Sequence, residues 1–292
     1  MSQSFPTRHH PASTEAETLS RMLADFLIDV PYNSISQFYR IFENQVPPQQ
    51  FGTSCVWQSY LLGDRIHSSL KDCQLTYLHD GRHIALTCAT RSRIFLLDPY
   101  LLHKDAIELP VEDGEQSESR AYPDRKDAAG NDHPGRLLVR RDANTLKLIY
   151  SRFSPTRLHP FIARAFHLDM ADQAPQDPPE GEFIKPLLYH GEQNNLSIRM
   201  VLRESRDMAE LIYPISVLHR QPVQKANLLT RDNQGRFMNP TDPGHNTLLC
   251  RMSESLGCTT GELEDFVLEG VRIYERHAPK EIDYAPYKMT ND

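Results

Sequence analysis

Three residue types in the first third of the 292-residue chain have the order of a nucleophilic acyl-transfer centre: a cysteine, then a histidine, then an aspartate. Cys55 opens the apolar run 55–62 and follows three small residues, Gly52, Thr53 and Ser54. This pattern predicts a helix that begins at the cysteine. Unpaired N–H groups and the helix dipole favour negative charge at that position. We therefore expect Cys55 to be a nucleophilic thiolate.

The histidine and the aspartate lie on two strand-like segments, 83–88 and 94–98, that predict a hairpin. If the loop is Thr90-Arg91, residue i faces residue 181 − i, and His83 faces Asp98. Directly opposed residues have Cβ atoms about 4.5–5.5 Å apart, close enough for an imidazole and a carboxylate to form a hydrogen bond. Thr90-Arg91 lacks the Gly or Asn of a tight turn, so a longer loop could shift the register and separate the two side chains.

Together the three residues would divide the work of acyl transfer. The thiolate attacks an acyl carbon, the imidazole takes and returns the proton, and the carboxylate fixes the imidazole tautomer. Each residue alone has an ordinary explanation, because a free Cys is commonly a buried hydrophobe and an Asp before a proline is commonly a turn residue. Their order favours the combined interpretation, with Cys55, His83 and Asp98 as catalytic residues.

These segments resemble the arylamine N-acetyltransferase family, over about the first 110 residues. Pro31-Tyr32-Asn33 resembles the family's "P-F/Y-E-N" stretch, and 51–62 resembles the segment of its glycine-preceded catalytic cysteine. The resemblance implies that Cys55 accepts the acyl group, His83 is the base and Asp98 orients it. It also implies an α+β fold with a helical N-terminal part, a β-rich middle and a mixed α/β C-terminal part.

The resemblance further implies a cysteine-dependent acyltransferase that passes an acyl group from Cys55 to an amine in a biosynthetic pathway. It would hold no tightly bound cofactor and would use an acyl-CoA or a phosphopantetheine thioester as co-substrate. Off-loading cyclases of the macrolactam or Dieckmann type, which act on carrier-protein-bound chains, fit the same triad. Pro99-Tyr100-Leu101 replaces the family's glycine-containing stretch, which favours this alternative. A catalytically inactive binding module is the third interpretation.

Other candidate residues follow from proximity or charge. Trp57, Phe95 and Tyr100 neighbour the triad in sequence and are expected to bind substrate, and the Cys55 N–H is expected to help form an oxyanion hole. Arg136 and Arg140-Arg141 could meet a phosphate, although exposed arginines are more commonly solvated. The sequence 242–245, Asp-Pro-Gly-His, predicts a turn, and no glycine-rich phosphate loop is found.

Composition limits the partners. A net charge of −7 argues against nucleic acid or an anionic membrane as the main partner, leaving a small-molecule or carrier-bound acyl substrate. The chain has no apolar run of about 18 residues, so no membrane span is expected. The first ten residues lack the apolar core of a secretory signal, so a cytoplasmic protein is expected. Five scattered cysteines favour reduced thiols, without a metal site.

The expected organisation has four parts. Residues 1–12 form a disordered tail, 13–70 a helical part with the nucleophile, 71–225 a β-rich part with a mobile loop at 110–135, and 226–292 an α/β part. Capping boxes and apolar periodicity predict helices at 14–28, 34–43, from 55 toward 67, and at 259–279. Hairpins are expected at 136–140 with 145–150 and at 196–202 with 208–214.

Overall fold

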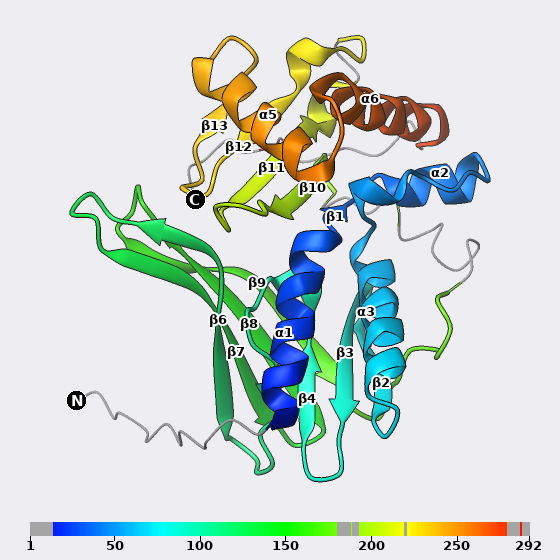
Figure 1. Ribbon diagram of the computed structural model, residues 1–292, viewed down its shortest axis with the longest axis vertical. Helices are drawn as coiled ribbons and strands as arrows, with labels where there is room; N and C mark the ends of the chain where they lie inside the picture. The colour runs from blue at the N-terminus through cyan, green and yellow to red at the C-terminus, as the bar shows by residue number, and fades with distance from the viewer. Residues whose placement is uncertain (1–13, 180–187, 189–192, 219–220, 279–286, 288–292) are drawn as a thin grey trace.

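The computed structural model describes residues 14–179, 188, 193–218, 221–278 and 287. In this part of the chain the fold is mixed α and β, with three antiparallel sheets (Figure 1). The helices are α1 (Thr14–Asp29), α2 (Ser36–Phe42), α3 (Cys55–Ser69), α5 (Pro243–Leu256) and α6 (Thr260–His277). Two short 3₁₀ helices matter for the site, η1 (Gln49–Phe51) and η2 (Pro99–Leu101).

The three sheets contain thirteen described strands, and most neighbours in a sheet are also neighbours in sequence. One sheet has the order β2 (Gln74–Asp80), β3 (His83–Ala89), β4 (Ile94–Leu97) and β5 (Ile107–Glu108). A second has β6 (Gln116–Lys126), β7 (Asp132–Asp142), β8 (Thr145–Ser154) and β9 (His159–Asp169). The third has β1 (Tyr32–Asn33), β10 (Asn195–Val201), β11 (Met208–Pro214), β12 (Leu229–Arg231) and β13 (Phe237–Met238).

The β2–β5 sheet is covered on both faces. Leu86 and Leu97 pack with α1 and α3, whereas their neighbours Ala85 and Leu96 pack against the β6–β9 sheet. Successive residues of a strand point to opposite faces, so both sets are buried. This explains why β3 and β4 are apolar almost throughout, and it fixes α3 against the strand that carries His83.

In Figure 1 the β1–β10–β11–β12–β13 sheet lies above the other two sheets. Helices α2, α5 and α6 pack against one of its faces. Gly270 of α6 allows this close packing, since a Cβ there would lie 2.0 Å from Cγ2 of Ile35. Among the described residues, none of the helices is both long and apolar enough to cross a membrane.

Several expected elements are confirmed. The first, third and last helices lie at 14–29, 55–69 and 260–277, and Thr259 and Glu262 form the expected capping box. Both expected hairpins form, as β7–β8 and β10–β11. The second helix is shorter than expected and is α2; the Asn33 side chain accepts hydrogen bonds from the N–H groups of Ile35 and Ser36.

Other expectations were wrong. The stretch 110–135 is not a loop but contains β6 and the start of β7, whose inward positions are small or polar and therefore lack an apolar pattern. Residues 243–245 begin α5, with Pro243 in its first turn, rather than forming a turn. The boundary expected between 225 and 226 cuts through one sheet, because β11 pairs with β12. The tail expected at 1–12 lies outside the described residues.

Candidate active site

The segment that precedes Cys55 is clamped to residues 31–33. Thr53 N–H donates to the Pro31 carbonyl at 3.0 Å, and Asn33 N–H donates to the Thr53 carbonyl at 2.8 Å. Gly52 has a φ of 72°, and a Cβ there would lie 1.9 Å from the Pro31 oxygen. Only glycine fits this position, because it lies in the left-handed region and against backbone. The clamp sets the start of the next helix.

Cys55 is the first residue of α3 and is half-buried. Two side chains near the start of α3 tether this end of the helix: Gln58 Nε2 donates to the Val30 carbonyl at 2.8 Å, and Ser59 Oγ donates to the Ile84 carbonyl at 2.7 Å. Ser54, the residue before the helix, gives no side-chain cap, and its Oγ is buried without a partner among the described residues. The thiol is therefore held beside the start of β3.

The hairpin that carries His83 and Asp98 has a different register from the expected one. Leu86 pairs with Leu97, and Ala89 pairs with Ile94, so the loop is 90–93 rather than Thr90-Arg91. The shift is two residues, and a two-residue shift keeps every side chain on its face. His83 and Asp98 are thus diagonal neighbours on one face and not directly opposed. His83 Nε2 lies 2.7 Å from Asp98 Oδ2, with both side chains buried.

The Asp98 side chain is held in place by backbone donors. Its Oδ1 accepts hydrogen bonds from the N–H groups of Tyr100 and Leu101 at the start of η2. Its own N–H donates to His103 Nε2 at 2.7 Å, and the opposite ring nitrogen, Nδ1, donates to the Asp105 carbonyl at 2.8 Å. Burial lowers the pKa of His103, which keeps this ring neutral. No sequence motif had pointed to His103.

The proton on His83 is placed by these contacts. Nε2 donates to Asp98, so Nδ1 is the nitrogen that can exchange a proton with reacting groups; Nδ1 is buried, and with the raised pKa it is also protonated at neutral pH. Burial alone lowers the pKa of His83, but the charge and hydrogen bond of Asp98, with a smaller effect of Cys55, raise it to about 10. The ring also stacks on Phe166 of β9, with centroids 3.9 Å apart. Cys55, His83 and Asp98 are therefore brought together, with Nδ1 on the side of the thiol.

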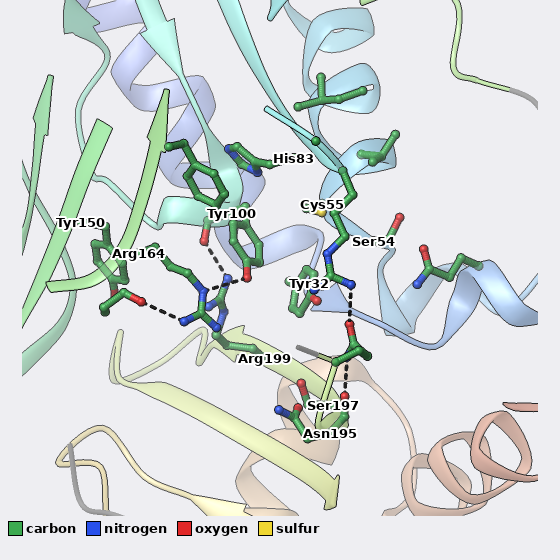
Figure 2. A pocket seen from close by; sticks show the side chains of 18 of the residues that line it. Tyr32, Ser54, Cys55, His83, Tyr100, Tyr150, Arg164, Asn195, Ser197 and Arg199 are labelled. Atoms are coloured by element: carbon green, nitrogen blue, oxygen red, sulfur yellow. Dashed lines mark hydrogen bonds between the residues drawn. The ribbon is translucent and has the colours of Figure 1, made fainter. Parts of the chain in front are cut away.

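A cavity of about 960 Å³ opens at this centre, where the three sheets meet (Figure 2). Cys55, His83 and Tyr100 are among the residues that line it. The expectation for Trp57 and Phe95 is corrected. Trp57 lies under the Arg40 guanidinium, and Phe95 is in the core between β4 and the helices. Trp57 lies two residues from Cys55 on a helix, and Phe95 lies three residues from Asp98 along a strand, so each side chain points in a different direction from its neighbour in the triad.

The cavity also contains residues that the sequence had not indicated. Five residues lie opposite one another on neighbouring strands and form one row across the third sheet. In order across the sheet they are Tyr32, Arg199, Glu210, Arg231 and Phe237. Arg152 of β8 and Arg164 of β9 line the cavity from the second sheet. One signal was present in the sequence: Arg199 and Glu210 are each the single charged residue of a strand-like segment.

The arginines considered earlier for phosphate binding lie elsewhere. Arg136 pairs with Glu118 at 3.2 Å on the surface of β7, and Arg141 donates to the carbonyls of Ala143 and Pro110. They and Arg140 are absent from the cavity lining. Among the described residues, no three His, Cys, Asp or Glu side chains gather in a way that could hold a metal ion.

Comparisons of the chain with protein-family models, with curated proteins and with solved structures found no match.

Proposed function

We propose that the protein is a cysteine-dependent acyltransferase that forms a thioester on Cys55 and passes the acyl group to an amine. The observation that carries the proposal is the buried His83–Asp98 pair, whose Nδ1 lies on the side of a half-buried thiol at a helix N-terminus. The resemblance of residues 31–33, 51–62, 83 and 98 to arylamine N-acetyltransferases supports the same activity.

In the first half-reaction the Cys55 thiolate attacks the carbonyl carbon of a thioester donor, either acyl-CoA or a phosphopantetheine thioester. The bond from this carbon to the donor sulfur breaks, and the donor thiol leaves with the proton from His83 Nδ1. In the second half-reaction an amine attacks the acyl-enzyme, His83 takes the amine proton, and Cys55 is released as an amide forms. Asp98 holds the ring orientation and stabilises the imidazolium in both steps.

The start of α3 supports stabilisation of the intermediate oxyanion. Ser54 does not cap the helix, so its side chain leaves the first N–H groups uncovered. The N–H of Cys55 and the buried Ser54 Oγ, which has no described partner, are the proposed donors. Donors already in place cost no reorganisation when the charge develops.

An off-loading cyclase acting on a carrier-bound chain is the second candidate. The cavity volume of about 960 Å³ favours it, because this is room for a drug-sized acyl chain and far more than an acetyl group occupies. In such an enzyme the amine or carbon nucleophile belongs to the same chain that is bound to Cys55.

Intact-protein mass spectrometry after incubation with acetyl-CoA, or with an acylated phosphopantetheine, tests the proposal. We expect one acyl adduct that is absent from Cys55→Ser and forms normally in Cys250→Ser, a control at an exposed thiol. An adduct from acetyl-CoA favours the acetyltransferase, and one from the pantetheine donor alone favours the cyclase.

Iodoacetamide labelling separates an enzyme from an inactive binding module. Selective fast labelling of Cys55 is expected, and labelling no faster than that of Cys73 or Cys250, with no adduct from either donor, would overturn the proposal.

A further inference from the structure

The cavity beside Cys55 carries a large excess of positive charge. Arg82, Arg152, Arg164, Arg199 and Arg231 line it, and a sixth arginine, Arg125, is fully buried and close enough for the charge of Arg152 to lower its pKa. Among the described lining residues, Glu210 is the sole carboxylate, and it pairs with Arg231 at 3.3 Å. The charges of Arg199 and Arg152 also act on Glu210, but this one carboxylate faces five lining arginines, so the described lining keeps a clear excess of positive charge.

These guanidinium groups retain free donors. Nε of Arg152 and Nε of Arg199 are buried and have no hydrogen-bond partner among the described residues. Arg199 otherwise donates to the Tyr100 carbonyl at 2.6 Å, and Arg164 donates to the Ala163 carbonyl at 2.8 Å and to the Tyr100 hydroxyl at 3.5 Å. A buried charged donor without an acceptor is costly, so it calls for an acceptor that arrives with a ligand.

The pKa values of two neighbouring residues, Arg125 and Tyr100, reflect the same excess of positive charge. Burial, together with repulsion from Arg152 and Arg231, lowers the pKa of Arg125 to about 9. Burial raises the pKa of Tyr100, but the charges of Arg164 and Arg199 outweigh burial and bring the pKa below its usual value. An anion in the cavity would relieve this repulsion.

We propose that Arg152, Arg164 and Arg199 bind an anionic group, a carboxylate or a phosphate, of the molecule that reacts at Cys55. The arginine site stands on its own geometry, whereas its link to the reacting molecule rests on the proposed function of Cys55. Planar guanidinium groups match both kinds of oxyanion by paired hydrogen bonds.

The position of the anion relative to the thiol follows from two tyrosines. The Arg199 guanidinium lies over the rings of both Tyr32 and Tyr100, at 5.0 and 4.8 Å from their centroids. The same two tyrosines are electrostatic neighbours of Cys55. Figure 2 shows Arg164 and Arg199 below Tyr100, with Cys55 on the other side of Tyr32 and Tyr100. The anionic group and the acyl carbon would therefore lie on opposite sides of these two tyrosines.

Calorimetry on Cys55→Ser tests the site without thiol chemistry. The probes are succinate, inorganic phosphate and the neutral succinamide. We expect at least one of the two anions to bind, no binding of succinamide, and at least tenfold weaker binding in Arg199→Gln and Arg164→Gln. Arg199→Lys, which keeps the charge, is expected to bind with an intermediate affinity. Arg136→Gln removes the same charge from the surface and is the matched control.

The outcomes are distinct. Preference for phosphate or for succinate identifies the source of the anion, and either supports the site. Equal binding of succinate and succinamide, binding of neither anion, or equal affinities in folded Arg199→Gln and Arg136→Gln would overturn it. Folding of each variant is checked by circular dichroism.

Labelling of Cys55 connects the site to the reaction. A maleimide with a carboxyalkyl chain should label wild-type Cys55 at least fivefold faster than N-ethylmaleimide, and Arg199→Gln should remove this preference. If calorimetry shows no anion binding while both maleimides label Cys55 at normal rates, the arginine site is wrong and the proposed acyltransferase still stands. An unreactive thiol with normal anion binding defeats the proposed acyltransferase and leaves the arginine site standing.

Discussion

Two histidine–aspartate pairs of this protein have the same atoms in contact and different surroundings. His83 Nε2 meets Asp98 Oδ2 at 2.7 Å, and His133 Nε2 meets Asp127 Oδ2 at 3.0 Å. Each imidazole stacks on a phenylalanine at 3.9 Å, Phe166 or Phe153. The first pair has side-chain exposures of 3% and 0%, the second of 35% and 19%.

The difference shows what makes such a pair a candidate for catalysis. Asp127 closes a turn: it also accepts hydrogen bonds from the N–H groups of Ala129 and Asn131, and no cysteine lies in its segment. Asp98 instead holds a buried ring that also interacts with Cys55. The His–Asp contact is common to both pairs, so burial and the nearby thiol make the distinction.

Asp98→Asn and Asp127→Asn should separate the two pairs most sharply. Asp98→Asn is expected to slow acylation of Cys55 by roughly 10³-fold, because the amide no longer fixes the ring tautomer or stabilises the imidazolium. Asp127→Asn should change the rate by less than twofold. Acylation by 4-nitrophenyl acetate, followed by mass spectrometry, measures both. Similar rates in the two variants would remove the distinction.

Two glycines provide a comparison of the backbone in the same two regions. Gly52→Ala should destabilise the protein by about 3 kcal/mol or more, since a Cβ would meet the Pro31 oxygen at 1.9 Å and φ is 72°. Gly130→Ala, in the Asp127 turn, has a φ of 86° but open space, so about 1 kcal/mol is expected. Urea unfolding measures both. An equal loss of stability in the two variants would mean that the backbone of residues 52–53 can move away from Pro31 at little cost.

His103→Leu tests the support behind Asp98. The change leaves the Asp98 N–H buried without an acceptor, which should cost about 1–3 kcal/mol of stability. As a positioning residue, His103 should also affect the ring that Asp98 holds. If Asp98 shifts, the His83 ring loses its orientation toward Cys55, and a small misplacement of a catalytic group slows the reaction. We therefore expect about tenfold slower acylation of Cys55 and a changed pKa of His83, measured by NMR titration. A loss of stability with an unchanged titration would restrict His103 to packing.

The two pairs should affect stability at opposite ends of the pH range. The pKa of His83 is raised to about 10, since Asp98 outweighs the lowering effect of burial. Its contribution is complete below its unfolded pKa of about 6.5 and is lost as the pH rises toward the folded value. Hydrogen bonds from His133, then Asn131, lower the pKa of Asp127, so its contribution is present above about pH 4 and lost as the pH falls.

Urea midpoints of the wild type and of the two Asn variants, measured from acid to alkaline pH, test the direction in which each pair's contribution to stability changes with pH. The difference between wild type and Asp98→Asn should shrink above neutral pH, and the smaller difference for Asp127→Asn should shrink in acid. The reverse pattern would contradict the assigned protonation of His83.

Local features were predictable where neighbours in sequence decide the structure. Thr259 and Glu262 cap their helix as expected, and small residues before an apolar run located the start of α3. The hairpin was predicted with the wrong loop, but its error of two residues preserved the face shared by His83 and Asp98. An error of one residue would have separated them, because side chains alternate along a strand.

Features that depend on other elements were not predictable. Residues 116–126 look like a loop because small and polar side chains, and Arg125, fill its inward positions, which are buried by contact with β7 and β8. Trp57 and Phe95 were assigned to the cavity from proximity alone, but the helix and the strand turn both away.

The sequence by itself determined the secondary structure around Cys55 and His83, because capping, periodicity and turn formation act over a few residues. It also determined which residues could act as nucleophile, base and orienting group. Only the tertiary structure decided that Arg152 and Arg164 of one sheet face Arg199 of another, because pairing of distant strands joins residues that share no local pattern. The charge of the cavity is therefore a property of the packed sheets, and the candidate triad is a property of one short stretch of chain.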